Sequence, residues 1–102
     1  MRTHTLVLFG AGPAWVAGRG SRGQQHWAAH AAFIAGLTER GLLVAGGPFG
    51  DESGALNILS EPLEKIDVER LYALDPFVQH GIFVLDRAVP WVVFVDNWVT
   101  AG

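Results

Sequence analysis

Residues 24–48 constrain the fold most, because a helical pattern there runs directly into a short apolar segment. Apolar side chains recur every three or four residues up to Arg40, which predicts a helix over residues 24–40. Gly41 suits the position after a helix end, and the uniformly apolar residues 42–45 are typical of a strand covered on both faces. Glycine and proline at positions 46–48 are expected to end that strand.

Four further segments have clear patterns. Residues 3–10 are β-branched and apolar and predict a first strand, and residues 55–59 predict a third strand that pairs as a hairpin with the second. A second helix is expected from Ser60, a capping candidate, to residue 74, because Pro76 disfavours a helical conformation at Asp75. Its buried face is predicted to hold Leu63, Ile66, Leu71 and Leu74. Residues 81–95 predict the last strand, with Pro90 at an edge or a bulge.

The order strand, helix, strand, strand, helix, strand predicts an α+β fold, a ferredoxin-like βαββαβ sandwich with both helices on one sheet face. We expect one domain over residues 1–102, with its core in residues 3–95 and a tail from residue 96. Half of the residues are hydrophobic, with four Trp and six Phe, which is more apolar surface than one small domain easily buries. The open sheet face is therefore expected to meet a second copy in a homodimer.

Composition excludes several classes of function. The net charge of −3 and the lack of a Lys/Arg cluster argue against nucleic-acid binding. No apolar run has the length of a membrane span and no signal peptide is evident, so we expect no membrane association and a cytoplasmic location. The absence of cysteine excludes disulfides, thiolate metal sites and a cysteine nucleophile. The motif Gly10-x-Gly12 is not a nucleotide-binding loop, because no helix opens after it, and no cofactor is predicted.

His30 is the principal candidate for chemistry, because a titratable ring is unusual on the apolar side of a helix. It is either a core histidine bonded to a backbone carbonyl or a general acid or base oriented by a carboxylate. Asp75 is the best carboxylate candidate, and Asp51 in the turn after Pro48 competes with it. His26 lies one helical turn before His30, a spacing that suits a metal, but no third ligand is evident and no metal site is predicted. His80 is expected in an exposed loop.

Several residues are candidates for the wall of a ligand pocket beside His30. Aromatic side chains and the glycine–proline segment suit a planar small molecule. The absence of Arg or Lys from these motifs argues against a strongly phosphorylated ligand. The loop over residues 10–23 either covers the site or merely connects two elements. The predicted substrate-binding residues are Trp27, Gly47, Pro48, Phe49, Asp51, Phe77 and Trp91.

The chain resembles the YCII-related proteins in the order and spacing of several short motifs. These are Trp27-x-x-His30-Ala-Ala-Phe33, then Leu37, Gly41, Gly46-Gly47-Pro48, Asp75-Pro76-Phe77, Gly81 and Val89-Pro90-Trp91. The resemblance implies two ferredoxin-like protomers packed sheet to sheet in a dimeric α+β barrel. His30 and Asp75 match the suspected catalytic pair of that family, whereas residues 17–23 depart from its pattern. Relatives include dehydrochlorinases of chlorinated hydroxyaromatics, and muconolactone isomerases share the barrel.

Three functions follow as hypotheses. In the first, the protein is a small cofactor-independent lyase or isomerase, in which His30 moves a proton on a cyclic or hydroxyaromatic molecule and Asp75 orients the ring. The second is a non-catalytic dimeric module that binds a small ligand beside His30. The third is an interaction protein that uses the barrel only to dimerise.

Overall fold

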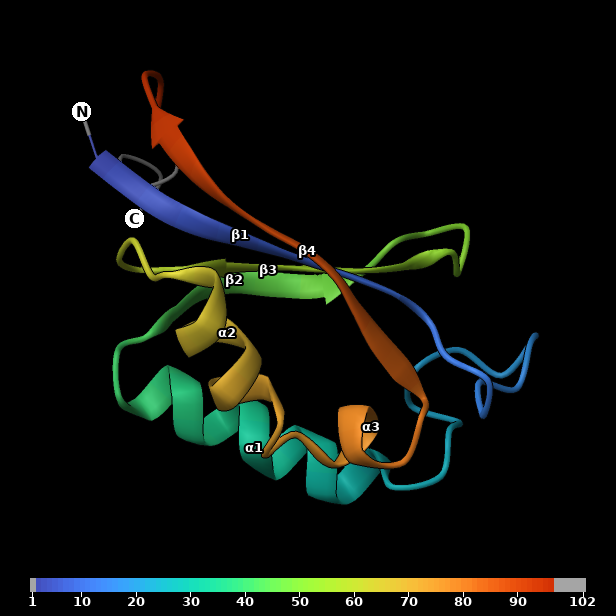
Figure 1. The fold of residues 1–102 in the computed structure, drawn as a ribbon. Helices are drawn as coiled ribbons and strands as arrows, with labels where there is room; N and C mark the ends of the chain where they lie inside the picture. The colour runs from blue at the N-terminus through green and yellow to red at the C-terminus, as the bar shows by residue number, and fades with distance from the viewer. Residues whose placement is uncertain (1, 97–102) are drawn as a thin grey trace.

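The computed structural model describes residues 2–96, which form one antiparallel sheet and three helices. The sheet has the strand order β2-β3-β1-β4, and Figure 1 shows α1 and α2 on the same face of it. This is the arrangement that two right-handed crossovers produce, so the predicted ferredoxin-like sandwich is confirmed. The elements are β1 (Arg2–Ala11), α1 (Trp27–Glu39), β2 (Leu43–Pro48), β3 (Gly54–Leu59), α2 (Lys65–Tyr72), α3 (Pro76–Gln79) and β4 (Phe83–Val93).

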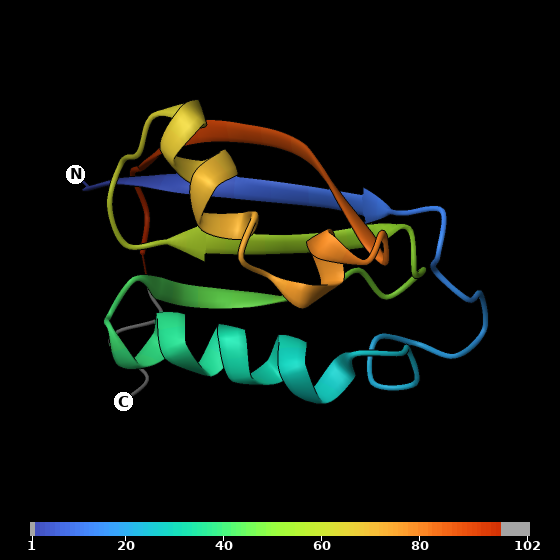
Figure 2. The same cartoon turned by 60° about the horizontal axis from the view of Figure 1, so that its bottom comes forward.

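The core lies between the sheet and the helical layer, which Figure 2 shows from the helical side. Because side chains alternate along a strand, Val7 and Phe9 of β1 point to this layer and are 0% and 3% exposed. Their cross-strand partners in β3 are Asn57 and Ala55. The other alternate set, which includes Leu6, lies on the opposite face. The second copy expected on that face stays a prediction.

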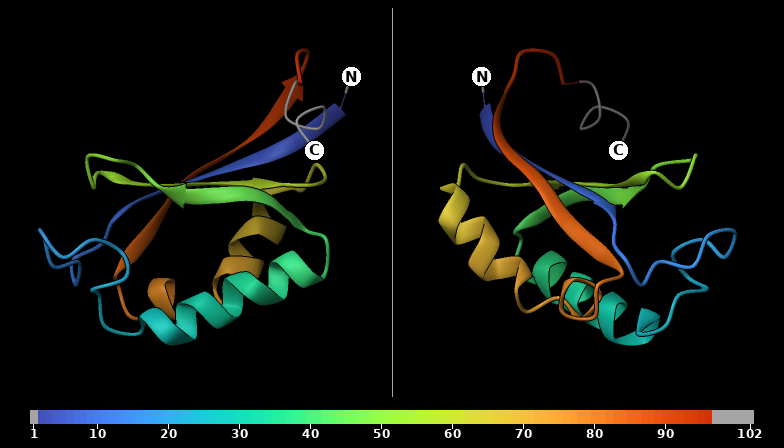
Figure 3. Two further views of the ribbon diagram at one scale, coloured as in Figure 1. Left: turned by 180° about the vertical axis from the view of Figure 1, so that it is seen from behind. Right: turned by 45° about the vertical axis from the view of Figure 1, so that its right-hand side comes forward.

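The pairing of β1 with β4 carries a local irregularity. Leu8 pairs with Arg87 but Phe9 pairs with Leu85, so one residue of β4 is extra at this point. Figures 1 and 3 show the N-terminal half of β1 and the C-terminal half of β4 rising together away from the helices. Pro90 lies in β4, an edge strand, as predicted, because an edge strand can lose one backbone donor without losing its ladder.

Strand β2 differs from its prediction in both length and burial. It continues through Gly46, Gly47 and Pro48, which pair with Asn57, Leu56 and Ala55 of β3. It is also an edge strand and mostly exposed, so the expectation of a strand covered on both faces is wrong. Small residues and proline are tolerated at an edge, and here they leave the space beside β3 open.

The second helix begins later than predicted, and its buried face differs. The Thr5 hydroxyl donates to the Glu61 carbonyl at 2.9 Å and accepts from the Leu63 amide at 2.9 Å, which ties this segment to β1 in a non-helical conformation. The helix therefore starts at Lys65, and its buried residues are Val68 and Tyr72, one turn apart. The predicted face is wrong in part, since Ile66 and Leu74 are 51% and 65% exposed.

The helices of the described segment are short. The longest, α1, has 13 residues, and no helix within residues 2–96 is long and apolar enough to cross a membrane. The predicted tail lies outside the described residues from position 97 onward. The cytoplasmic location stays a prediction.

Candidate functional site

The structure brings His30 and Asp75 into direct contact. His30 lies in α1 and Asp75 immediately before α3, and Nδ1 of the ring is 2.8 Å from the carboxylate Oδ1. Both groups are buried, with side-chain exposures of 11% and 1%. Nε2, on the opposite side of the ring, has no hydrogen-bond partner within residues 2–96. The contact therefore orients the imidazole and leaves one nitrogen for another molecule.

Asp75 is held by its own backbone position. It is the N-cap of α3, and its Oδ1 accepts the Phe77 amide N–H at 2.9 Å as well as the His30 ring. Pro76 at the first helical position is favourable there, because it has no N–H that would be left unpaired. An ionised carboxylate oxygen can only accept hydrogen bonds, so Oδ1 accepts the Nδ1–H of His30 as well as the Phe77 amide N–H. This places the proton of a neutral His30 ring on Nδ1 and the lone pair on Nε2.

Aromatic side chains enclose the His30 ring. Phe77 stacks on it with ring centroids 3.9 Å apart and planes 7° apart, while Phe83 meets it edge-on at 5.9 Å and 85°. Trp27 lies on a third side at 5.6 Å. These rings limit rotation of the imidazole and remove much of its hydration, so the Asp75 contact lies in a region of low polarity.

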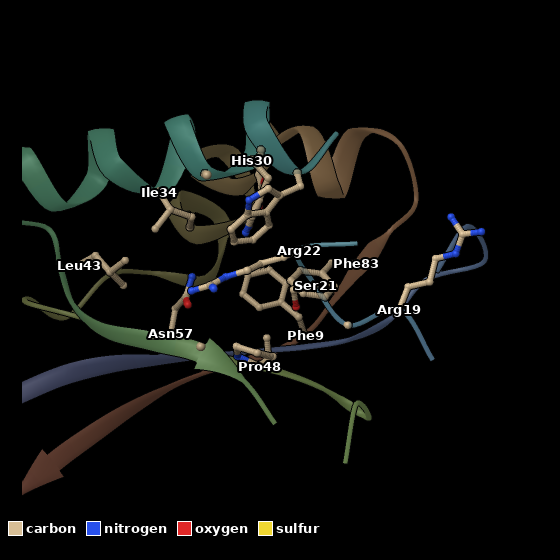
Figure 4. A pocket seen from close by; sticks show the side chains of 17 residues that line it. Phe9, Arg19, Ser21, Arg22, His30, Ile34, Leu43, Pro48, Asn57 and Phe83 are labelled. Atoms are coloured by element: carbon tan, nitrogen blue, oxygen red, sulfur yellow. The ribbon is translucent and has the colours of Figure 1, made fainter. Parts of the chain in front are cut away.

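A cavity of about 630 Å³ opens beside His30, between α1 and the sheet. Figure 4 shows His30 and Ile34 of α1 above it and Pro48 of β2 below it, with side chains of β1, β3 and β4 around it. Its volume is within the ordinary range for small-molecule sites, and most of its lining is apolar. Residues of the glycine-rich segment form another part of its wall. The lining includes Phe9, Ser21, Arg22, Trp27, His30, Ile34, Leu43, Gly46, Gly47, Pro48, Ala55, Asn57, Asp75 and Phe83.

A second polar pair lies below the cavity. The side-chain amide of Asn57 donates through Nδ2 to the Tyr72 hydroxyl at 2.8 Å. Gly46 of the neighbouring strand approaches Asn57 so closely that a Cβ there would collide with Oδ1 of the amide. Burial raises the pKa of Tyr72 to about 12, with the Asn57 hydrogen bond opposing this effect and the charge of Asp75 adding to it. Tyr72 is therefore a neutral part of the site at physiological pH.

The raised pKa of Tyr72 predicts a loss of stability at alkaline pH. In the unfolded chain the hydroxyl ionises near 10.0 and in the folded protein near 12, so the folded state binds this proton more tightly. The contribution to stability is complete below about pH 10 and should decrease as the pH rises toward about 12. Tyr72 is the only tyrosine in the chain, so tyrosinate absorbance reports it directly. A midpoint near 10 in the folded protein, equal to that in denaturant, would contradict this prediction.

The predicted site residues divide into three groups. Trp27, Gly47 and Pro48 line the cavity beside His30 and Asp75. Phe77 lies behind the imidazole and is 0% exposed, so it supports the ring and is not part of the cavity wall.

The third group lies outside the cavity and corrects three predictions. Phe49 lines a separate hollow on β2 with Leu56 and Ile58. Asp51 is exposed in its turn, where hydrogen bonds from the side chain and backbone of Ser53 lower the pKa of its carboxyl group. Trp91 lies beside His4, with ring centroids 6.2 Å apart, and not beside His30. The alternation of strand residues and the turn geometry direct these side chains elsewhere.

The side chains of His26 and His80 contact each other. Their rings are stacked, with centroids 3.7 Å apart and planes 5° apart, and both residues are exposed. His26 has φ of 67° and precedes α1, so the helix begins at Trp27 and not at residue 24. The His26 carbonyl still accepts the His30 backbone N–H at 2.9 Å, but the left-handed conformation of His26 and the stacking of its ring on His80 do not give the shared metal site that helical spacing would suit. Within residues 2–96, no group of three or more His, Asp or Glu side chains is placed to hold a metal ion.

Several cavity residues were not predicted from the sequence. Phe9, Asn57 and Phe83 are ordinary strand residues in sequence, although their alternation with outward-facing neighbours was a usable signal. Arg22 and Ser21 belong to the glycine-rich loop, where no periodic pattern exists. The loop adds two basic residues, Arg19 and Arg22, to the cavity lining, so the absence of Arg and Lys from the motifs beside His30 no longer argues against a phosphorylated ligand.

Comparison with known proteins shows a likeness to a solved structure. No family model matches the chain. No curated protein matches it either. Among solved structures, it is similar to 5-chloro-2-hydroxyhydroquinone dehydrochlorinase from Burkholderia phenoliruptrix in complex with 2,5-dihydroxybenzoquinone, with a TM-score of 0.56 and 19% identity over 87% of this chain and 92% of that one. At this identity the likeness shows the fold alone, a small α+β domain with a four-stranded antiparallel sheet.

Proposed function

We propose that the protein is a cofactor-independent lyase or isomerase of the YCII-related type, acting on a small hydroxylated ring. The observation that carries this proposal is the 2.8 Å contact between His30 Nδ1 and Asp75 Oδ1, with Nε2 left free beside the cavity. A histidine oriented by a buried carboxylate is suited to accept a proton through its other nitrogen, and the carboxylate stabilises the imidazolium that forms.

The reaction proposed is a proton transfer. Nε2 accepts a proton from a ring hydroxyl or a ring carbon, and the electron pair released enters the ring system. In a lyase reaction that pair expels a leaving group from a neighbouring position, and in an isomerase reaction the imidazolium returns the proton to a different carbon. Neither course needs an external oxidant or reductant.

The shape of the cavity suits a planar ligand. Its aromatic and aliphatic walls and its volume of about 630 Å³ accommodate a single substituted ring. The dehydrochlorinase with the similar fold acts on a chlorinated hydroxyhydroquinone and was solved with a dihydroxybenzoquinone. Hydroxylated and chlorinated six-membered rings are therefore the first compounds to test.

The experiment is a screen of such rings in D₂O, followed by NMR and by chloride measurement. Protein-dependent chloride release would support a lyase, and protein-dependent deuterium incorporation at a ring carbon would support an isomerase. If compounds bind but none is converted, the non-catalytic binding module becomes the better description, because the same cavity serves for binding alone.

A further inference from the structure

The glycine-rich segment between β1 and α1 is held in a defined conformation by hydrogen bonds and forms part of the cavity wall. Gln24 is 5% exposed, and its amide bonds to both the N–H and the C=O of Val16 at 2.8 Å and to the Gly20 carbonyl at 2.9 Å. The Gly20 amide in turn donates to the Glu52 carboxylate at 2.9 Å. These bonds attach the loop to itself and to the turn between β2 and β3, so its side chains have defined directions.

Two of those side chains bring positive charge to the cavity lining, Arg19 and Arg22. Figure 4 shows Arg22 extending from the loop toward Asn57, with Arg19 of the same loop farther from Asn57. Arg22 has no ion pair or hydrogen bond from its side chain to any residue in the range 2–96. The buried carboxylate of Asp75 does not neutralise it, because Asp75 is 1% exposed and is occupied by His30 and Phe77.

A second unpaired donor lies next to Arg22. The Ser21 hydroxyl oxygen is buried, lines the same cavity and is the one buried side-chain oxygen or nitrogen in the described residues that has no hydrogen-bond partner. Buried polar atoms normally have a partner, so an unsatisfied hydroxyl at a cavity wall is consistent with a partner supplied by a ligand. A guanidinium and a hydroxyl side by side suit an oxygen that carries negative charge.

We infer that the ligand of this cavity carries an anionic oxygen, which Arg22 pairs with and Ser21 hydrogen-bonds. This inference rests on the proposed function for the nature of the ring, and it adds a determinant of specificity that lies apart from the proton-transfer pair. The anionic oxygen is either a carboxylate substituent or an ionised ring hydroxyl, and the two share the chemistry that Arg22 recognises.

The test compares the binding of three ring compounds by the wild type and three variants. Hydroquinone is neutral, 2,5-dihydroxybenzoate carries a carboxylate, and 2,5-dihydroxybenzoquinone carries ionised ring oxygens at neutral pH. Their affinities are measured by calorimetry or NMR titration for the wild type, Arg22→Gln, Arg22→Lys and the matched control Arg40→Gln. Arg40→Gln removes the same charge from an exposed side chain at the C-terminal end of α1, which is not part of the cavity lining.

We expect the wild type to bind at least one anion more tightly than hydroquinone. Arg22→Gln should weaken that binding roughly five- to tenfold, as for a charge-assisted bond at a partly exposed site, and leave hydroquinone unchanged. Arg22→Lys should retain part of the preference, and Arg40→Gln nearly all of it. A loss confined to the benzoate identifies a carboxylate as the recognised group, and one confined to the quinone identifies a ring oxyanion.

Two results would overturn the inference. One is equal anion affinity in Arg22→Gln and Arg40→Gln, and the other is a wild type that binds neither anion more tightly than hydroquinone at millimolar concentration. Both are binding measurements that need no turnover. The proposed function fails on a different observation, namely turnover that survives removal of His30.

Discussion

Replacing His30 by glutamine should lower the turnover of a converted substrate by roughly 10²- to 10⁴-fold, the usual contribution of a positioned acid or base. Glutamine has a similar length and can still donate to Asp75, so the fold should persist. It cannot accept and carry a proton as the imidazole does. Ligand affinity should therefore change little, and the loss should be in kcat. Steady-state kinetics and calorimetric titration on the same preparation separate the two effects.

His26→Gln is the matched control for this experiment. It makes the same chemical change four residues earlier, at an exposed ring that stacks on His80 outside the cavity. Its kinetics should be close to those of the wild type. If His30→Gln also turns over substrate at the wild-type rate, the acid–base role is wrong. If it loses affinity and the wild type shows no turnover, the protein is a binding module.

Replacing Asp75 by alanine should lower the free energy of unfolding by about 3 kcal/mol or more, because it leaves two buried N–H donors without an acceptor. These are the His30 ring and the Phe77 amide, which share Oδ1 at 2.8 and 2.9 Å. Removing the N-cap of α3 adds to the loss. Urea denaturation followed by tryptophan fluorescence measures the change.

Asp75→Asn separates the structural role from the catalytic one. The amide oxygen can still accept both N–H groups, so this variant should be close to the wild type in stability. It lacks the negative charge that stabilises an imidazolium, so its turnover should fall by roughly 10²-fold. Asp51→Ala, at an exposed turn, should change the free energy of unfolding little and serves as the control for losing a carboxylate. Asp75→Ala and Asp51→Ala of equal stability would contradict the account.

The sequence predicted those features that depend on local patterns. Strand alternation, the Ala-rich helical stripe and the glycine after it were sufficient for the topology. The Asp75-Pro76 pair also contained the signal for α3, since aspartate is a favourable N-cap and proline a favourable first helical residue. In the sequence, however, Pro76 indicates only the end of the second helix, so α3 is not predicted.

The remaining features depend on contacts between segments that are far apart in the chain. Thr5 of β1 delays the start of α2 by binding residues 61 and 63, and nothing near Ser60 in the sequence indicates this. Ile66 belongs to an apolar helical pattern yet lies in solvent, because Val68 and Tyr72 face the sheet. The loop that holds Arg22 has no periodic pattern, so the sequence does not indicate which way its side chains point. The placement of Arg22 in the cavity is therefore a result that only the three-dimensional structure provides.

The most direct test of the central claim is the tautomer of His30, measured by long-range ¹H–¹⁵N NMR on protein labelled at its four histidines. The His30→Gln spectrum identifies the signal. For the neutral ring, we expect a proton on Nδ1 and a free lone pair on Nε2, and we expect Asp75→Ala to abolish this preference. A proton on Nε2 in the wild type would contradict the account, because the nitrogen beside the cavity would then have no lone pair with which to accept a proton.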